Sequence, residues 1–101
     1  MIAEYIRYAL AEHSGDDLIA AYATAAEHLR DAPECHGFEL SRCDDDPASF
    51  ILRIVWTSAS AHMDGFRNGP NFPPFLAAIR PFIGEIAEMR HYTPTEVVWA
   101  R

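Results

Sequence analysis

One segment, residues 50–57, constrains the fold more than any other because almost every side chain in it is apolar. It reads Phe-Ile-Leu-Arg-Ile-Val-Trp-Thr, so both faces of an extended chain carry large hydrophobic groups, with Arg53 as the charged exception. Its length and its β-branched and aromatic content favour a strand. A strand that is apolar on both sides must be covered on both sides. We therefore expect helices on one face of a sheet and another sheet on the other.

The remaining segments carry either a strand period or a helix period. Three of them alternate apolar and polar side chains with period two and are expected to be strands: residues 2–10, 35–43 and 84–92. Others carry apolar side chains at helical spacing and are expected to be helices: residues 15–31, 58–67 and 72–80. Asn68-Gly69-Pro70 separates the last two, which we regard as one broken helix.

The resulting order, β-α-β-β-α-β, is the split βαβ pattern of ferredoxin-like α+β folds, in which helices cover one face of a four-stranded antiparallel sheet. A chain of 101 residues has room for one compact domain, so we assign residues 1–101 to a single domain. We expect the uncovered sheet face to be buried by a second copy in a twofold homodimer. The tail, residues 93–101, keeps apolar side chains and is expected to lie against the body or the partner.

Charge and cysteine content exclude several classes of partner. The chain has 15 acidic residues against 8 basic ones, a net charge of −7, so it would repel nucleic acid and anionic membranes. We also expect neither a transmembrane span nor a signal peptide, because Glu4 and Arg7 interrupt the apolar run that a signal peptide would need. Cys35 and Cys43 fall in one expected strand, roughly 26 Å apart, too far for a disulfide. A reducing cytoplasmic setting is therefore expected, with an intersubunit disulfide as the alternative.

A group of residues between Trp56 and Phe75 resembles the pattern of the antibiotic biosynthesis monooxygenase (ABM) domain family. In that family the Trp of the third strand is followed by Ser, by His ten residues beyond the Trp, and by Ser-Pro-His-Phe with a further Phe. The residues that match are Trp56, Ser58, Pro70, Phe72 and Phe75. In element order and length the resemblance covers essentially the whole chain, and it implies a dimeric α+β barrel.

The sequence departs from the family pattern at three positions: Phe66 stands at the first His, Gly69 at the Ser and Asn71 at the second His. Family members described as monooxygenases oxidise quinols or aromatic polyketides without metal or flavin, and relatives degrade haem. The resemblance therefore implies a cofactor-independent monooxygenase for a small aromatic or quinol-type substrate. The alternative is a non-catalytic dimeric module that binds a small hydrophobic ligand or a protein. A haem-degrading activity would require a proximal His where Asn71 stands.

Cofactor-free oxygenation needs a dry apolar pocket, a base, and a donor for the developing oxyanion. His62, the imidazole nearest to the missing family histidines, is the candidate base because it titrates near neutral pH. Four aromatic residues are expected to form the pocket walls: Trp56, Phe66, Phe72 and Phe75. Three residues of the expected sheet are candidate donors: Tyr5, Arg53 and His91.

Each candidate also has a purely structural interpretation. The ordinary interpretation, which the residue types favour, makes His62 a half-exposed residue and the aromatic residues part of the core. Arg53 is expected to pair with Glu39 or Glu88 across the sheet, and His91 suits a dimer interface. No two histidines show the spacing of metal ligands, so we expect no metal site.

Overall fold

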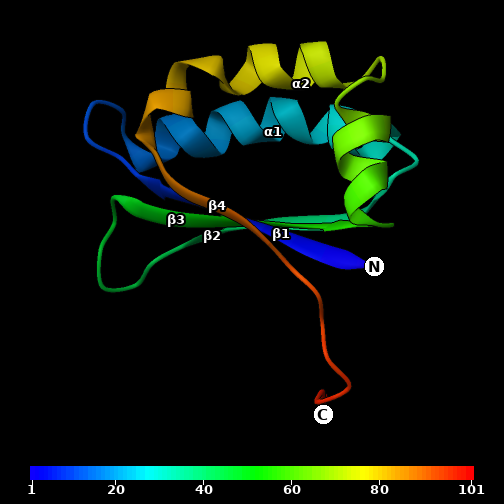
Figure 1. Ribbon diagram of the computed structural model, residues 1–101. Coiled ribbons are helices and arrows are strands. Elements are labelled where there is room, and N and C mark those ends of the chain that lie inside the picture. Colours follow the sequence, from blue (N-terminus) through cyan, green and yellow to red (C-terminus); the bar gives the residue numbers. More distant parts are fainter.

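The computed structural model describes all 101 residues as a four-stranded sheet with helices on one of its faces (Figure 1). The sheet order is β2-β3-β1-β4, and every neighbouring pair is antiparallel. The strands are β1 (Ile2–Ala9), β2 (Cys35–Arg42), β3 (Ser49–Trp56) and β4 (Ile86–Tyr92). The ferredoxin-like α+β fold is confirmed, and each strand lies within two residues of its expected range.

The helical layer contains four segments: α1 (Gly15–Asp31), a π-helix (Ala61–Phe66), α2 (Phe72–Ile79) and a 3₁₀ helix (Arg80–Glu85). A reciprocal capping box starts α1 at the expected residue, because the Ser14 hydroxyl accepts from the Asp17 amide at 3.1 Å. The Asp17 carboxylate accepts in return from the Ser14 amide. Helical structure continues past residue 80, the expected end, because Pro81 lies in the first turn of the 3₁₀ helix, where a missing amide is tolerated.

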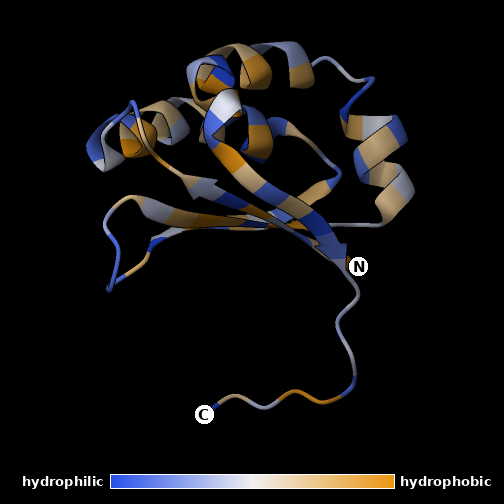
Figure 2. Ribbon diagram, turned by 60° about the vertical axis from the view of Figure 1, so that its left-hand side comes forward, coloured by the Kyte–Doolittle hydropathy of each residue, from blue (hydrophilic) through white to orange (hydrophobic).

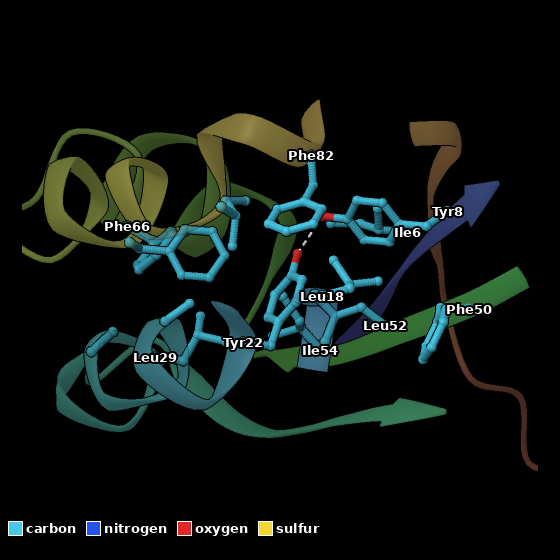
Figure 3. Packing of buried hydrophobic residues seen from close by; sticks show 14 of the residues in the cluster. Ile6, Tyr8, Leu18, Tyr22, Leu29, Phe50, Leu52, Ile54, Phe66 and Phe82 are labelled. Carbon is cyan, nitrogen blue, oxygen red and sulfur yellow. Dashed lines mark hydrogen bonds between the residues drawn. The ribbon is translucent and has the colours of Figure 1, made fainter. Parts of the chain in front are cut away.

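The alternation of β3 places its largest side chains between the sheet and the helices. Phe50, Leu52, Ile54 and Trp56 are all buried on the helix-covered face. The Tyr8 and Tyr22 hydroxyls hydrogen-bond to each other inside this core, which Figure 3 shows with the surrounding side chains. Burial raises the pKa of Tyr8 to about 12, so the pair stays neutral. Each large apolar group buried here contributes roughly 1.5 to 3 kcal/mol to folding.

A β-bulge changes which β4 side chains face the helices. Ile86 pairs with Tyr8 and Met89 pairs with Ile6, so the register shifts between them. As a result Ile86 and Met89 both face the helical layer, whereas simple alternation had put them on opposite sides. The sequence interpretation of β4 was wrong on this point, because one extra residue reverses the alternation. A second register shift, between Cys35 and Gly37, marks an irregularity in β2.

The face of the sheet away from the helices, which we call the open face, mixes apolar and charged side chains. Figure 2 shows the tail leaving the body on this side of the sheet. Val97, Val98 and Trp99 are 87%, 83% and 74% exposed, so the tail does not lie against the body as one alternative expected. The other alternative, contact with a partner, remains a prediction. No helix is long and apolar enough to span a membrane.

Replacing Leu52 by Ala tests the contribution of β3 to the core. Leu52 is fully buried, so the substitution removes apolar contacts and leaves a cavity, and we expect a loss of roughly 2 to 5 kcal/mol in unfolding free energy. Ile19→Ala on the exposed side of α1 is the control and should change stability by about 0.5 kcal/mol or less. Urea denaturation measures both, and equal effects would contradict the proposed layering.

Candidate active site

A cavity of about 190 Å³ lies between the sheet and the helical layer. Its walls are mostly apolar, and aromatic rings from β3, the π-helix and α2 line one side. Three polar side chains also reach it: Glu4, His62 and Arg67. An apolar cavity with a few convergent polar groups is the usual form of a small-molecule site. We therefore take it as the candidate active site.

Glu4 is an acidic side chain at an inward position of β1. It shares a face with Ile6 and Tyr8 and is 2% exposed. The Trp56 indole Nε1 donates a hydrogen bond of 3.0 Å to Glu4 Oε1, which partly offsets the desolvation of the carboxyl group. Burial nevertheless raises the pKa of Glu4, against the opposing effects of Trp56, His91 and Arg67.

His62 lies in the π-helix, stacked on the Trp56 ring at a centroid distance of 4.4 Å and an interplanar angle of 8°. The Arg67 amide bonds to the His62 carbonyl at 3.1 Å, an i→i+5 contact that closes the wide turn. Such π turns recur at functional sites. Because His62 is 2% exposed, its interpretation as a half-exposed surface residue does not hold.

The His62 ring lies between two other ionisable groups. Its Nδ1 is 2.8 Å from His91 Nε2, a hydrogen bond that joins it to an exposed residue of β4. Its Nε2 is 3.6 Å from Glu4 Oε1, beyond hydrogen-bond range, and is therefore available to another group. Burial, helped by the nearby Arg67 and His91, lowers the pKa of His62 to about 4. His62 is therefore neutral at pH 7, with a free lone pair, but its pKa lies well below the near-neutral value for which it was chosen as the base.

Glu4, His62 and His91 form the set of two histidines and one carboxylate that binds iron in some oxygenases. One donor atom from each lies within 4.8 Å of the others. His62 presents its two nitrogens to different neighbours. The three residues therefore lie in a line, with His62 between His91 and Glu4.

The structure brings together most of the residues selected from the sequence. The candidate base and the four aromatic residues all line the cavity: His62, Trp56, Phe66, Phe72 and Phe75. His91 reaches the site through its contact with His62. Tyr5 and Arg53 lie opposite each other on the open face, and Arg53 is 4.0 Å from Glu39, one of its expected partners. These two side chains do not reach the cavity.

Sequence reasoning missed two residues of the site, Glu4 and Arg67. Glu4 left a signal, because it occupies the same strand parity as Ile6 and Tyr8, where an acidic side chain must point into the core. The sequence contains no comparable signal for Arg67, since a single arginine after an apolar helix is ordinary. The contact between His62 and His91 was also missed, because the two are 29 residues apart and only the sheet register brings them together.

Comparison with known proteins identifies the relatives of this chain. The family model described as antibiotic biosynthesis monooxygenase matches residues 1–78. A solved structure from Bordetella bronchiseptica, named for the same family, has a TM-score of 0.78 at 24% identity, covering 93% of this chain and 96% of the other. SnoaB, a cofactor-independent oxygenase from Streptomyces nogalater, has a TM-score of 0.75 at 19% identity, with 96% of this chain and 95% of the other covered. No curated protein matches.

The lowered pKa of His62 predicts a pH-dependent stability term. The unfolded chain binds a proton at His62 near pH 6.5, whereas the folded chain does so only near pH 4. Folded stability is therefore lost as pH falls through this window, by at most about 3 kcal/mol. The groups that face His62 are Glu4, Arg67 and His91.

His62→Gln should remove this term. Urea denaturation of wild type and variant is compared between about pH 7.5 and pH 4, with His28→Gln on the surface of α1 as a matched control. We expect the wild type to lose more stability than His62→Gln as pH falls. A constant difference between the two proteins across this range would contradict a buried, neutral His62.

Proposed function

Because the chain belongs to the antibiotic biosynthesis monooxygenase family, we propose that it is a monooxygenase that oxidises a small aromatic or quinol-type substrate with dioxygen and no bound cofactor. The observation that carries the proposal is a buried, neutral imidazole, His62, beside an apolar cavity walled by aromatic rings. The similarity in fold to SnoaB, named as a cofactor-independent oxygenase, supports this class of reaction.

For this reaction the protein has to supply little more than a base and a cavity that excludes water. His62 Nε2 accepts a proton from an acidic C–H of the bound substrate, leaving a stabilised anion. The anion passes one electron to dioxygen, and the two radicals combine to form a C–O bond and a peroxide. The peroxide anion takes back the proton held by His62, and cleavage of its O–O bond with loss of the second C–H proton releases water, so that a substrate CH₂ becomes C=O. Exclusion of water by the aromatic walls protects the anion from being reprotonated.

The proton on His62 also has a route for exchange with solvent. With Nε2 as the base, the neutral His62 ring carries its proton on Nδ1, which lies 2.8 Å from Nε2 of His91, an exposed residue at the edge of the sheet. A proton arriving at Nε2 can therefore leave from Nδ1 through His91 to water. Glu4 Oε1, 3.6 Å from His62 Nε2, favours the transient imidazolium. Glu4 and His91 act on the reaction through His62, so we regard them as positioning residues.

We also propose a homodimer formed through the open face, in the cytoplasm. The open face carries a central set of apolar and aromatic side chains: Tyr5, Ile51, Val55 and Tyr92. The same face also carries basic and acidic side chains, and this mixture suits a self-complementary twofold contact. These charged residues are Arg7, Arg53, Arg90, Glu39 and Glu88. The exposed tail extends on this same side, where a partner would cover it. Two free cysteines are compatible with a reducing compartment.

Oxygen consumption with a panel of one- and two-ring hydroquinones and naphthols, which suit a cavity of about 190 Å³, tests the reaction. With a substrate that the wild type oxidises, His62→Ala should lower kcat by about 100-fold or more, because the base is lost. His36→Ala, an exposed histidine on β2 that contacts Thr57, is the matched control and should keep wild-type activity.

Equal rates in the wild type and His62→Ala would remove His62 as the base. No uptake with any member of the panel, together with a hydrophobic ligand retained through purification, would favour the non-catalytic binding module. Phe66 and Asn71 at the family histidine positions are the observation behind that second candidate.

Sedimentation velocity at micromolar concentration tests the dimer. Wild type should sediment as a dimer, and Ile51→Asp should shift it to monomer because a charge then enters the apolar centre of the open face. Circular dichroism should show that the variant stays folded, since Ile51 lies outside the core of the subunit. A monomeric wild type under these conditions contradicts the dimer.

A further inference from the structure

Arg67 is the one cationic side chain that lines the cavity, and it follows directly on the π-helix. Its guanidinium lies over the Phe72 ring at 5.5 Å. Its Nη2 is 3.8 Å from Met89 Sδ, which is a weak acceptor. These contacts hold the guanidinium between the helical layer and β4. None of them neutralises its charge, since Arg67 takes part in no salt bridge within 4.0 Å.

Arg67 Nε is a buried hydrogen-bond donor without an acceptor. Among the buried side-chain nitrogen and oxygen atoms of the protein it alone lacks a partner. A buried donor without an acceptor destabilises a protein by about 1 to 3 kcal/mol, and by more when it is charged. Such a group therefore needs an explanation, and its position at the wall of the cavity suggests an acceptor supplied by a ligand.

The cavity limits the size of that ligand. Its volume of about 190 Å³ is smaller than the roughly 300 to 1,000 Å³ typical of drug-sized sites, so it accommodates one or two fused rings. Aromatic walls on three elements favour a flat, apolar ring system. An anionic oxygen suits the arginine because a charged acceptor forms the stronger hydrogen bond.

We propose that the cavity binds an aromatic molecule of one or two rings through an anionic oxygen, phenolate or carboxylate, that accepts a hydrogen bond from Arg67 Nε. This inference deepens the proposed function by naming a ligand class for the same site, and it rests on that proposal for the choice of site. Arg67 then selects the ligand and sets its orientation, whereas His62 acts on the reacting atom. Binding can be measured without turnover, so the two proposals can fail separately.

Calorimetric titration at neutral pH with three small probes tests the proposal. The probes are 2-naphthoate for a carboxylate, 4-nitrophenol for a phenolate, and 2-naphthamide as the neutral analogue of the first. We expect wild type to bind 2-naphthoate about tenfold or more tightly than 2-naphthamide. The yellow absorbance of the nitrophenolate anion should increase on binding if phenolate is also accepted, which distinguishes the two sources of the oxygen.

Arg67→Gln should abolish the preference for the anion while keeping the affinity for 2-naphthamide within about twofold, because the apolar walls are unchanged. Arg67→Lys keeps the charge but loses Nε, and it should retain part of the preference for the anion. It keeps the proposal testable if Arg67→Gln does not fold. Arg30→Gln is the matched control, since Arg30 stacks on Phe38 and does not line the cavity. It should bind like wild type.

Three results would overturn the proposal: equal affinity of wild type for naphthoate and naphthamide, an anion preference that survives in Arg67→Gln, or no binding of any probe. The first would mean that water alone satisfies Arg67 Nε. Tight anion binding without oxygen uptake in the presence of quinols would support the ligand class and contradict the monooxygenase.

Discussion

The candidate site depends on one constraint, the burial of the Glu4 carboxyl group in an otherwise apolar layer. A carboxyl group in such surroundings must be hydrogen-bonded or neutralised, because desolvating its charge is unfavourable. Trp56 supplies the hydrogen bond from the neighbouring strand, and the His62 ring packs flat against the same indole. The positions of Trp56 and His62 are thus tied to Glu4. His91 extends the line to the sheet edge.

The sequence predicted the scaffold well because the signals for it are local. Alternation in β1 and β3, the capping box at Ser14 and the prolines at the start of α2 each act within a few residues. The aromatic walls were also predictable, since Trp56 ends a strand that is apolar on both faces. These features need no knowledge of which segments meet in space.

The rest of the site arises from long-range register, which a single sequence does not display. The bulge in β4 decides that Met89 faces the cavity, and the β1–β4 pairing places His91 opposite Glu4. The wide turn of the π-helix brings Arg67 to the cavity wall. Tyr5 and Arg53 were assigned to the site because they are strand residues of suitable chemistry, but strand parity puts them on the open face.

Nitrogen-15 NMR of the histidine rings, with the signals of His62 assigned through the His62→Gln variant, tests the central claim most directly. The account predicts a neutral His62 ring at pH 6, with protonation only near pH 4, because the ring is buried beside Arg67. A His62 ring that is already doubly protonated at pH 6 would contradict it. Such a ring could not serve as the base, and the cavity would lose its role in catalysis.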